Sequence, residues 1–259
     1  MTVKERWAPF SKAIPDTKTI LAASIANLRI GSLPKAEART KFGDNLLLLM
    51  EEGLRLLRGY QDQQRKQFLL SALSTELPAL PSAIERELVT GGAPRDLAIR
   101  IVGTVGAEVA AMSGEFFSLP QKSIDQQTKK RAGVHMERAM AFLFEKAELP
   151  FQQQRPKKSD FVFPDGDTWE STPELAALVS AKHTLAERWK QLMGERHETG
   201  RNAYLATLDT LAQDKATKLT KHGFTLYVLP QVLNSLQPSP RIRDLNELPS
   251  MIAQVINCS

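Results

Sequence analysis

The apolar positions in the first half of the chain recur with the spacing of a helix. Residues from about 15 to 115 are rich in Leu, Ala, Glu, Arg and Gln, and "FGDNLLLLMEEGLRLLRGYQDQQRKQFLLSALS" carries the clearest stripe. The apolar members of this stripe are Leu46, Leu49, Met50, Leu54 and Leu57. Pro81 and Pro94 follow breaks in the pattern and suit the first turns of new helices. This half therefore predicts a helical bundle.

After Pro120 the pattern alternates between helix and strand. An amphipathic helix is expected at "TKKRAGVHMERAMAFLFEKAEL", and a second one at "HTLAERWKQLMGERHETG". Short apolar runs predict strands at "SDFVFPD", "ELAALVSAK" and "GFTLYVLP", the first closed by Pro164 and the Asp165-Gly166 pair. The simplest architecture is an α/β (α+β) fold in which helices flank a central sheet.

The length and composition of the chain indicate its number of domains and its cellular compartment. A chain of 259 residues holds one large domain or two smaller ones, and the change of pattern favours residues 1–118 and 119–259 as separate domains. The one cysteine, Cys258, excludes an intramolecular disulfide framework and a cysteine metal site. No signal peptide or spanning apolar run is seen, so we expect a soluble protein of a reducing bacterial cytoplasm with no membrane partner. The net charge of +5 admits an anionic partner without requiring one.

The candidate chemistry centres on one lysine and several carboxylates. Asp160 begins one predicted strand, and Lys182 ends the next. If these strands are antiparallel neighbours, a twisted hairpin can bring both residues to one sheet edge. Glu195 follows Lys182 by thirteen residues, and Glu137 lies on the preceding helix. Carboxylates around a lysine suit Mg²⁺-assisted hydrolysis of a phosphodiester, although each of these residues taken alone is more often a solvated surface charge.

Four segments, "RAGVHMERAMAFLFE", "SDFVFPD", "SAKHTLAERWKQLMGE" and "FTLYVLP", carry a resemblance to a known family. From about Leu119 to Pro230 the chain resembles the type II restriction endonucleases of the PD-(D/E)xK superfamily, in the EcoRII C-terminal, SsoII and NgoMIV group. In that group a small residue replaces the carboxylate of the acid-x-Lys element, and a helix glutamate takes over its role. Ser180 holds the replaced position here, and Glu195 the substitute.

The resemblance implies a role for each of these residues. Asp160 and Glu195 become the Mg²⁺ ligands, Lys182 becomes the catalytic lysine, and Glu137 supports the site or a second metal. The expected fold is a restriction-endonuclease-like core with a central mixed sheet at residues 119–259, preceded by an all-α N-terminal domain at residues 1–118. That domain could serve DNA contact, oligomerisation or regulation, and fold alone does not choose among these roles.

The helix after the lysine carries the expected DNA reader. Family members place a basic-acid-Arg cluster there, because arginine pairs with guanine O6 and N7 and a carboxylate accepts from cytosine N4. Glu187 and Arg188 match this cluster, whereas Ala186 replaces the first basic residue and removes one guanine contact. An exposed ion pair is the alternative interpretation of Glu187 and Arg188. Weaker candidates for contacts with the DNA backbone are His183, Lys190, Lys158 and Lys130.

These residues together predict a restriction endonuclease making Mg²⁺-dependent double-strand cuts at a short, nearly palindromic C·G-rich site. A two-fold target implies a homodimer, with a tetramer as the larger alternative, acting on double-stranded DNA. A cognate DNA methyltransferase is expected in the same system. The competing hypotheses are a non-catalytic DNA-binding or regulatory helical protein and a structure-selective DNA repair nuclease.

Overall fold

The computed structural model describes residues 2–76, 80–111, 114–155, 159–185 and 203–256. The chain forms two compact units, and each unit is made of two stretches that are not adjacent in the sequence. The first, here called the helical unit, contains Met1–Asp16 and Arg55–Lys129. The second, here called the sheet unit, contains Thr17–Leu54 and Lys130–Ser259. The helices α4 (Phe42–Glu76) and α7 (Glu115–Lys146) each contribute one part to both units.

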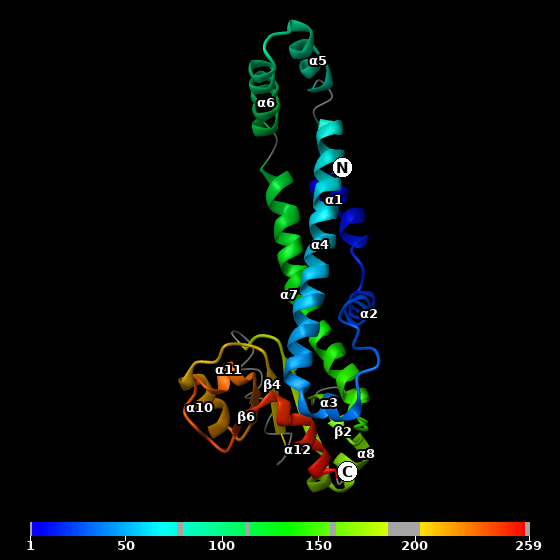
Figure 1. Cartoon of the computed structure of the whole chain (residues 1–259), viewed down its shortest axis with the longest axis vertical. Coiled ribbons are helices and arrows are strands. Elements are labelled where there is room, and N and C mark those ends of the chain that lie inside the picture. The colour runs from blue at the N-terminus through cyan, green and yellow to red at the C-terminus, as the bar shows by residue number, and fades with distance from the viewer. Residues whose placement is uncertain (1, 77–79, 112–113, 156–158, 186–202, 257–259) are drawn as a thin grey trace. The chain divides into compact units, whose positions relative to one another are not determined.

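The helical unit is built from α1 (Val3–Lys12), α5 (Leu80–Thr90), α6 (Pro94–Ala111) and the adjoining parts of α4 and α7. The helices α5 and α6 lie side by side (Figure 1). Each has a proline in its first turn, where the missing N–H would have no intrahelical partner, as the sequence predicted. The apolar core of this unit contains Trp7, Phe68, Phe116 and Ile124.

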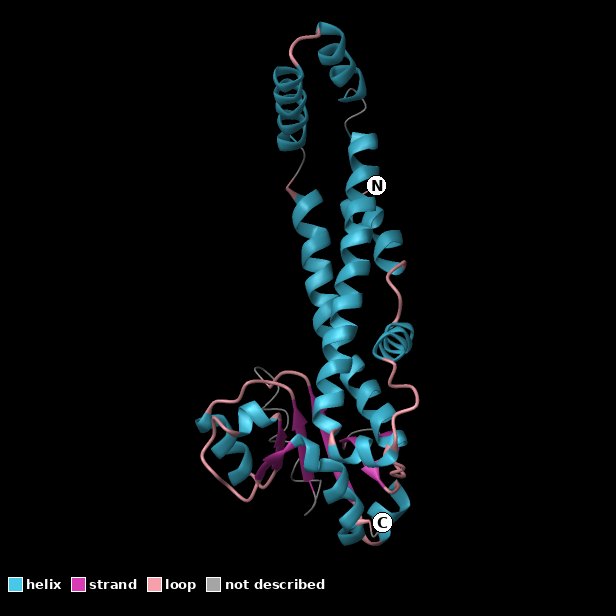
Figure 2. Ribbon diagram, viewed as in Figure 1, coloured by secondary structure: helices cyan, strands magenta, loops and turns pink. Residues whose placement is uncertain are grey.

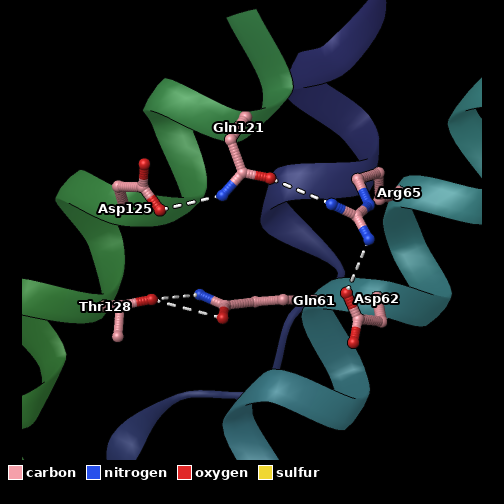
Figure 3. Close-up of polar contacts among 6 residues, drawn as sticks. All are labelled: Gln61, Asp62, Arg65, Gln121, Asp125 and Thr128. Atoms are coloured by element: carbon pink, nitrogen blue, oxygen red, sulfur yellow. Dashed lines mark hydrogen bonds and ion pairs between the residues drawn. The ribbon is translucent and has the colours of Figure 1, made fainter. Parts of the chain in front are cut away.

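Polar side chains join α4 to α7 inside the helical unit (Figure 3). The Gln61 amide donates a hydrogen bond of 2.9 Å to the Thr128 hydroxyl, and Gln61 is only 2% exposed. Nearby, Arg65 donates to Gln121 on α7 and to Asp62 on its own helix. Because a buried amide without a partner is costly, the Gln61–Thr128 pair fixes how the two helices are aligned along their length.

The sheet unit contains, among the described residues, a six-stranded sheet in the order β1 to β6 (Figure 2). Its strands are β1 (Gln152–Arg155), β2 (Ser159–Phe163), β3 (Ala177–Lys182), β4 (Ala203–Thr207), β5 (Thr225–Val228) and β6 (Ile242–Asp244). The pairs β1–β2 and β2–β3 are antiparallel, and the remaining pairs are parallel. The sheet is therefore mixed, and the expected fold class is confirmed.

The sheet unit also contains helices and short 3-10 turns. They are α2 (Thr17–Leu28), α3 (Lys35–Thr40), α8 (Gly166–Ser171), η1 (Pro173–Leu175), α10 (Gln213–Lys221), α11 (Pro230–Leu233), η3 (Leu245–Glu247) and α12 (Leu248–Val255). Within the described ranges, no helix has both the length and the apolar character needed to cross a membrane.

Aromatic side chains attach α7 to one face of the sheet. Phe144 of α7 packs edge-on against Phe161 and Phe163 of β2, with ring centroids 5.3 and 4.9 Å apart. Phe42, at the start of α4, stacks on the same Phe144 ring at 4.8 Å. Side chains alternate along a strand, so the odd-numbered residues of β2 face this aromatic cluster and Asp160 faces the opposite side of the sheet.

A glycine lets α7 approach α4 within the sheet unit. His135 of α7 is 3% exposed, and its Nε2 donates to the backbone carbonyl of Leu49 on α4 at 3.1 Å. A Cβ atom placed on Gly53 would lie 2.8 Å from Cδ2 and 2.5 Å from Cε1 of His135, and closer still to Nε2. Only a residue without a side chain leaves room for this imidazole.

The apolar patterns located the main elements. The expected helix at residues 128–149 is the second part of α7, and the three expected strands are β2, β3 and β5. The stripe on α4 is buried at Leu46, Leu49, Met50 and Leu57. The sequence did not predict β1, β4, β6 or the helices after β4. Of the helix expected at residues 183–200, residues 183–185 are not helical and the rest lies outside the described residues.

Candidate active site

Asp160 and Lys182 meet at one edge of the sheet. The strands β2 and β3 are antiparallel, with Phe161 opposite Val179, so Asp160 near the start of β2 lies beside the end of β3. The Lys182 ammonium donates to Asp160 Oδ2 at 2.9 Å. The backbone N–H of Ala181 donates to the same oxygen at 2.6 Å. The structure thus brings together two residues that are 22 positions apart in the sequence.

This ion pair is partly buried yet still open to solvent. The side chains of Lys182 and Asp160 are 15% and 19% exposed. Charges at such a place are screened less than on an open surface, so they act more strongly on a bound anion or cation. A carboxylate oxygen is a ligand that Mg²⁺ accepts, and an ammonium group attracts a phosphate. The pair offers one carboxylate and one ammonium group, two of the groups that Mg²⁺-assisted hydrolysis of a phosphodiester uses.

Ser180 lies on the same face of the sheet as these two residues, two positions before Lys182 on β3. One step beyond the paired residues Phe161 and Val179, it stands opposite Asp160 and is 7% exposed. Its hydroxyl brings no negative charge to the site. A second charged ligand for a metal ion must therefore come from another part of the chain. The resemblance seen in the sequence gives this role to Glu195.

The end of β4 supports the segment that follows Lys182. Thr207 pairs with Lys182 in the parallel ladder, and its side chain is fully buried. The Asp209 N–H donates to Thr207 Oγ1 at 3.1 Å, which bends the chain as soon as β4 ends. Asp209 Oδ2 then accepts the backbone N–H of Leu185 at 2.8 Å. Sequence reasoning missed Asp209, although an acid directly after the apolar stretch "AYLATL" could have indicated it.

His183 lies close to this acid. Burial lowers the pKa of His183, and the neighbouring Asp209 carboxylate opposes that shift only in part. Burial therefore favours the neutral imidazole. A neutral ring can still donate a hydrogen bond to a DNA phosphate, so the expected backbone contact of His183 stays a prediction.

The other expected site residues divide into two groups. Glu137 is half-buried and Lys130 is exposed, both on the part of α7 that belongs to the sheet unit. Five expected residues lie outside the described residues, namely Lys158, Glu187, Arg188, Lys190 and Glu195. Within the described ranges, no group of three or more His, Cys, Asp or Glu side chains could hold a metal ion. Asp160 fits the role of an oxygen ligand to Mg²⁺, and a complete ligand set needs further residues.

The sheet unit has the fold of restriction endonucleases. The structure is similar to metal-depleted Ecl18kI in complex with uncleaved, modified DNA, with a TM-score of 0.75 and 17% identity over 99% of this chain and 85% of that one. It is also similar to the restriction endonuclease PspGI in a substrate DNA complex, with a TM-score of 0.65 and 17% identity over 96% of both chains. At these identities the likeness concerns the fold alone.

Sequence comparison places the chain in a family. The model of the family described as "EcoRII C terminal" matches residues 100–245, which is more than half of the chain. The chain belongs to the EcoRII C-terminal family. The type II restriction enzyme SsoII of Shigella sonnei is 36% identical over 97 residues. That match spans about a third of SsoII, since it covers 32% of each protein. The resemblance seen in the sequence is thereby confirmed at the level of the family.

Proposed function

We propose that this protein is a Mg²⁺-dependent type II restriction endonuclease. It makes double-strand cuts at a short, nearly palindromic and C·G-rich DNA site and leaves 5′-phosphate ends. The observation that carries the proposal is the 2.9 Å contact between Lys182 and Asp160 at the sheet edge, in a chain of the EcoRII C-terminal family. The DNA complexes of Ecl18kI and PspGI support a duplex as the substrate.

Each residue of the site has a distinct part in the proposed reaction. Asp160 and Glu195 hold Mg²⁺, which when bound supplies Lewis-acid polarisation of the scissile phosphate. Lys182 orients the attacking water, and its positive charge offsets the negative charge that develops on the phosphate oxygens. The water oxygen forms a bond to phosphorus while the bond from phosphorus to O3′ breaks. The attacking water gives up one proton to solvent, the departing O3′ takes one up from solvent, and the products are a 5′-phosphate and a 3′-hydroxyl. Glu137 supports the metal ligands from α7.

Recognition of the DNA bases is assigned to Glu187 and Arg188, which follow Lys182 closely in the chain. Arg188 donates to a guanine and Glu187 accepts from a cytosine in the major groove. Ala186 provides no guanine contact, so Lys190, Arg196 or a residue elsewhere supplies the remaining one. Lys130, Lys158 and Lys190 contact the phosphate backbone, which makes binding dependent on salt.

The protein acts as a homodimer because a two-fold DNA target calls for a two-fold protein. A methyltransferase of the same system protects the host DNA. Of the two domains, residues 119–259 carry the catalytic site, and residues 1–118 serve DNA contact, oligomerisation or regulation. The compact units of the structure are divided differently, since Thr17–Leu54 lies in the same unit as the sheet. The start of α4 and α2 therefore belong structurally with the catalytic residues.

The proposal is tested by incubating the purified protein with phage or plasmid DNA in the presence of Mg²⁺ or EDTA and sequencing the fragment ends. We expect discrete Mg²⁺-dependent fragments that share a short palindromic sequence. Metal-independent binding without cleavage would instead favour a DNA-binding or regulatory protein. Preferential cutting of branched or mismatched DNA would favour a repair nuclease. A Lys182→Ala variant, prepared in parallel, controls for contaminating nucleases.

A further inference from the structure

A short connection joins the catalytic lysine to the residues assigned to base reading, and it is attached at one end to β4 and at the other to Asp209, just after β4. At one end, Lys182 is the last residue of β3 and pairs with Thr207 in the parallel ladder. At the other end, the backbone N–H of Leu185 donates to Asp209 Oδ2 at 2.8 Å. Only His183 and Thr184 lie between these two attachments. The connection therefore has little freedom to change its length or direction.

The position of Asp209 is itself fixed by its neighbours. Its N–H donates to Thr207 Oγ1 at 3.1 Å, and Thr207 is fully buried beside Lys182. Thr207 thus connects the lysine to the acid, and the acid connects back to Leu185. The Leu185 side chain is 1% exposed and belongs to the same apolar core as Leu211 and Leu219. Packing in the core therefore fixes the side chain of Leu185, and the hydrogen bond to Asp209 fixes its backbone.

We infer that Asp209 is a positioning residue that couples base reading to cleavage by fixing where the reading segment begins. This inference rests on the proposed function, because Glu187 and Arg188 follow Leu185 by two and three residues. Asp209 acts through the Leu185 backbone and makes no contact with the reacting atoms. Loss of this hydrogen bond would remove one of the two attachments of the connection that leads along the sequence from Lys182 to the base-reading residues. Binding of the correct bases would then be coupled less tightly to cleavage.

The chemistry of the contact predicts which substitutions preserve it. Asp209→Asn keeps an oxygen that can accept from the Leu185 N–H, although without the charge, whereas Asp209→Ala removes the acceptor. If Asp209 acted as a metal ligand or a general base, both substitutions would fail alike. Rescue by asparagine therefore separates a positioning role from a charge role. Asp214, which lies in the first turn of α10, provides a control through Asp214→Ala.

The experiment uses the full chain, a short duplex with the sequence found at the fragment ends, and the same duplex with one C·G pair changed. For Asp209→Ala we expect the ratio of cleavage rates on the two duplexes to fall about tenfold or more, as expected for a lost hydrogen bond to a charged acceptor. The affinity for unrelated DNA should stay close to wild type, and the urea midpoint should fall only modestly, because the Leu185 N–H loses its acceptor while the protein stays folded. Asp209→Asn should keep most of the wild-type ratio of cleavage rates. Asp214→Ala should leave this ratio unchanged.

The outcomes separate this inference from the proposed function. A wild-type protein that neither cuts nor prefers any DNA sequence overturns both. A wild-type protein that cuts at a defined site, together with an Asp209→Ala variant of unchanged discrimination, overturns the positioning role alone. If Asp209→Ala and Asp209→Asn lose discrimination equally, the charge of the carboxylate is what matters. That result also overturns the positioning role. If Asp209→Ala fails to fold, Thr207→Val tests the same chain of contacts, and unchanged discrimination in that variant overturns the inference.

Discussion

Gly53 is the position where a single added methyl group should disturb the sheet unit most clearly. In an ordinary exposed helix, Gly→Ala stabilises by up to about 1 kcal/mol because alanine is the better helix former. At Gly53 the new Cβ would lie within 2.8 Å of three atoms of the His135 ring. The ring is 3% exposed and is held by the Leu49 carbonyl at 3.1 Å. Burial and this hydrogen bond both oppose a rotation of the ring.

The expected cost of Gly53→Ala combines two effects. Displacing His135 breaks its hydrogen bond and leaves buried polar groups without partners, which costs about 1–3 kcal/mol. Forcing extra volume into a packed interior costs about 1–3 kcal/mol more. The helix preference of alanine offsets about 1 kcal/mol of this. We therefore expect Gly53→Ala to lower the free energy of unfolding by roughly 1–5 kcal/mol.

Urea denaturation followed by tryptophan fluorescence measures this change. Two matched controls are Gly59→Ala on α4 and Gly133→Ala on α7, because a Cβ at either position would meet no atom within 4 Å. Both controls should be neutral or slightly stabilising. In the Gly53→Ala, His135→Ala double variant, the steric conflict is gone, so its loss should be smaller than the sum of the single losses. Additive losses, or a Gly53→Ala variant as stable as the controls, would refute this account of the helix contact.

Four further predictions concern the active site and its surroundings. Lys182→Ala should abolish cleavage and largely preserve specific binding, and a gel-shift assay beside a cleavage assay checks both; retained cutting would contradict the assigned role. Arg188→Ala should weaken binding to the cognate site by about 1–3 kcal/mol, whereas an equal loss on all sequences would indicate a phosphate contact. Lys130→Ala should reduce the affinity for every sequence and lower the salt slope by about one, as a titration with NaCl would show. Burial lowers the pKa of His135 in the folded protein, so stability should be complete above pH ~6.5 and decline as the pH falls toward the lowered value. Urea midpoints between pH ~5 and ~7.5 measure this decline, which His135→Gln should flatten.

The sequence predicted the elements whose patterns are long or sharply bounded. The stripe on α4 repeats over many turns, and β2 ends at Pro164 and a turn-forming pair. By contrast, β6 has three residues and β1 four, which is too short for a periodic pattern to stand out. The sequence also did not predict that α4 is divided between the two units. An apolar stripe indicates that one face of a helix is buried, but it does not indicate which part of the chain buries it.

Only part of the site could be found in the same way. Asp160 and Lys182 were found because each lies at the end of a recognisable strand, and the antiparallel pairing of β2 with β3 then brings them together. Asp209 was missed because its partner Leu185 is 24 positions away. Their contact depends on the parallel pairing of β3 with β4, and β4 was not predicted. A residue that acts through the backbone of a distant segment leaves no local pattern in the sequence.

The change of strand direction at β3 places these residues at one edge of the sheet. Since β2 runs against β3 while β4 runs with it, the start of β2 and the ends of β3 and β4 coincide there. In an all-parallel sheet Asp160 would lie at the opposite edge from Lys182. The pairing of β2 with β3 must also be exact, because a shift of one residue would turn Asp160 to the other face. Burial of Phe161 and Phe163 against Phe144 opposes that shift, since it would expose both rings. The aromatic cluster on one face therefore maintains the pair of Asp160 and Lys182 on the other.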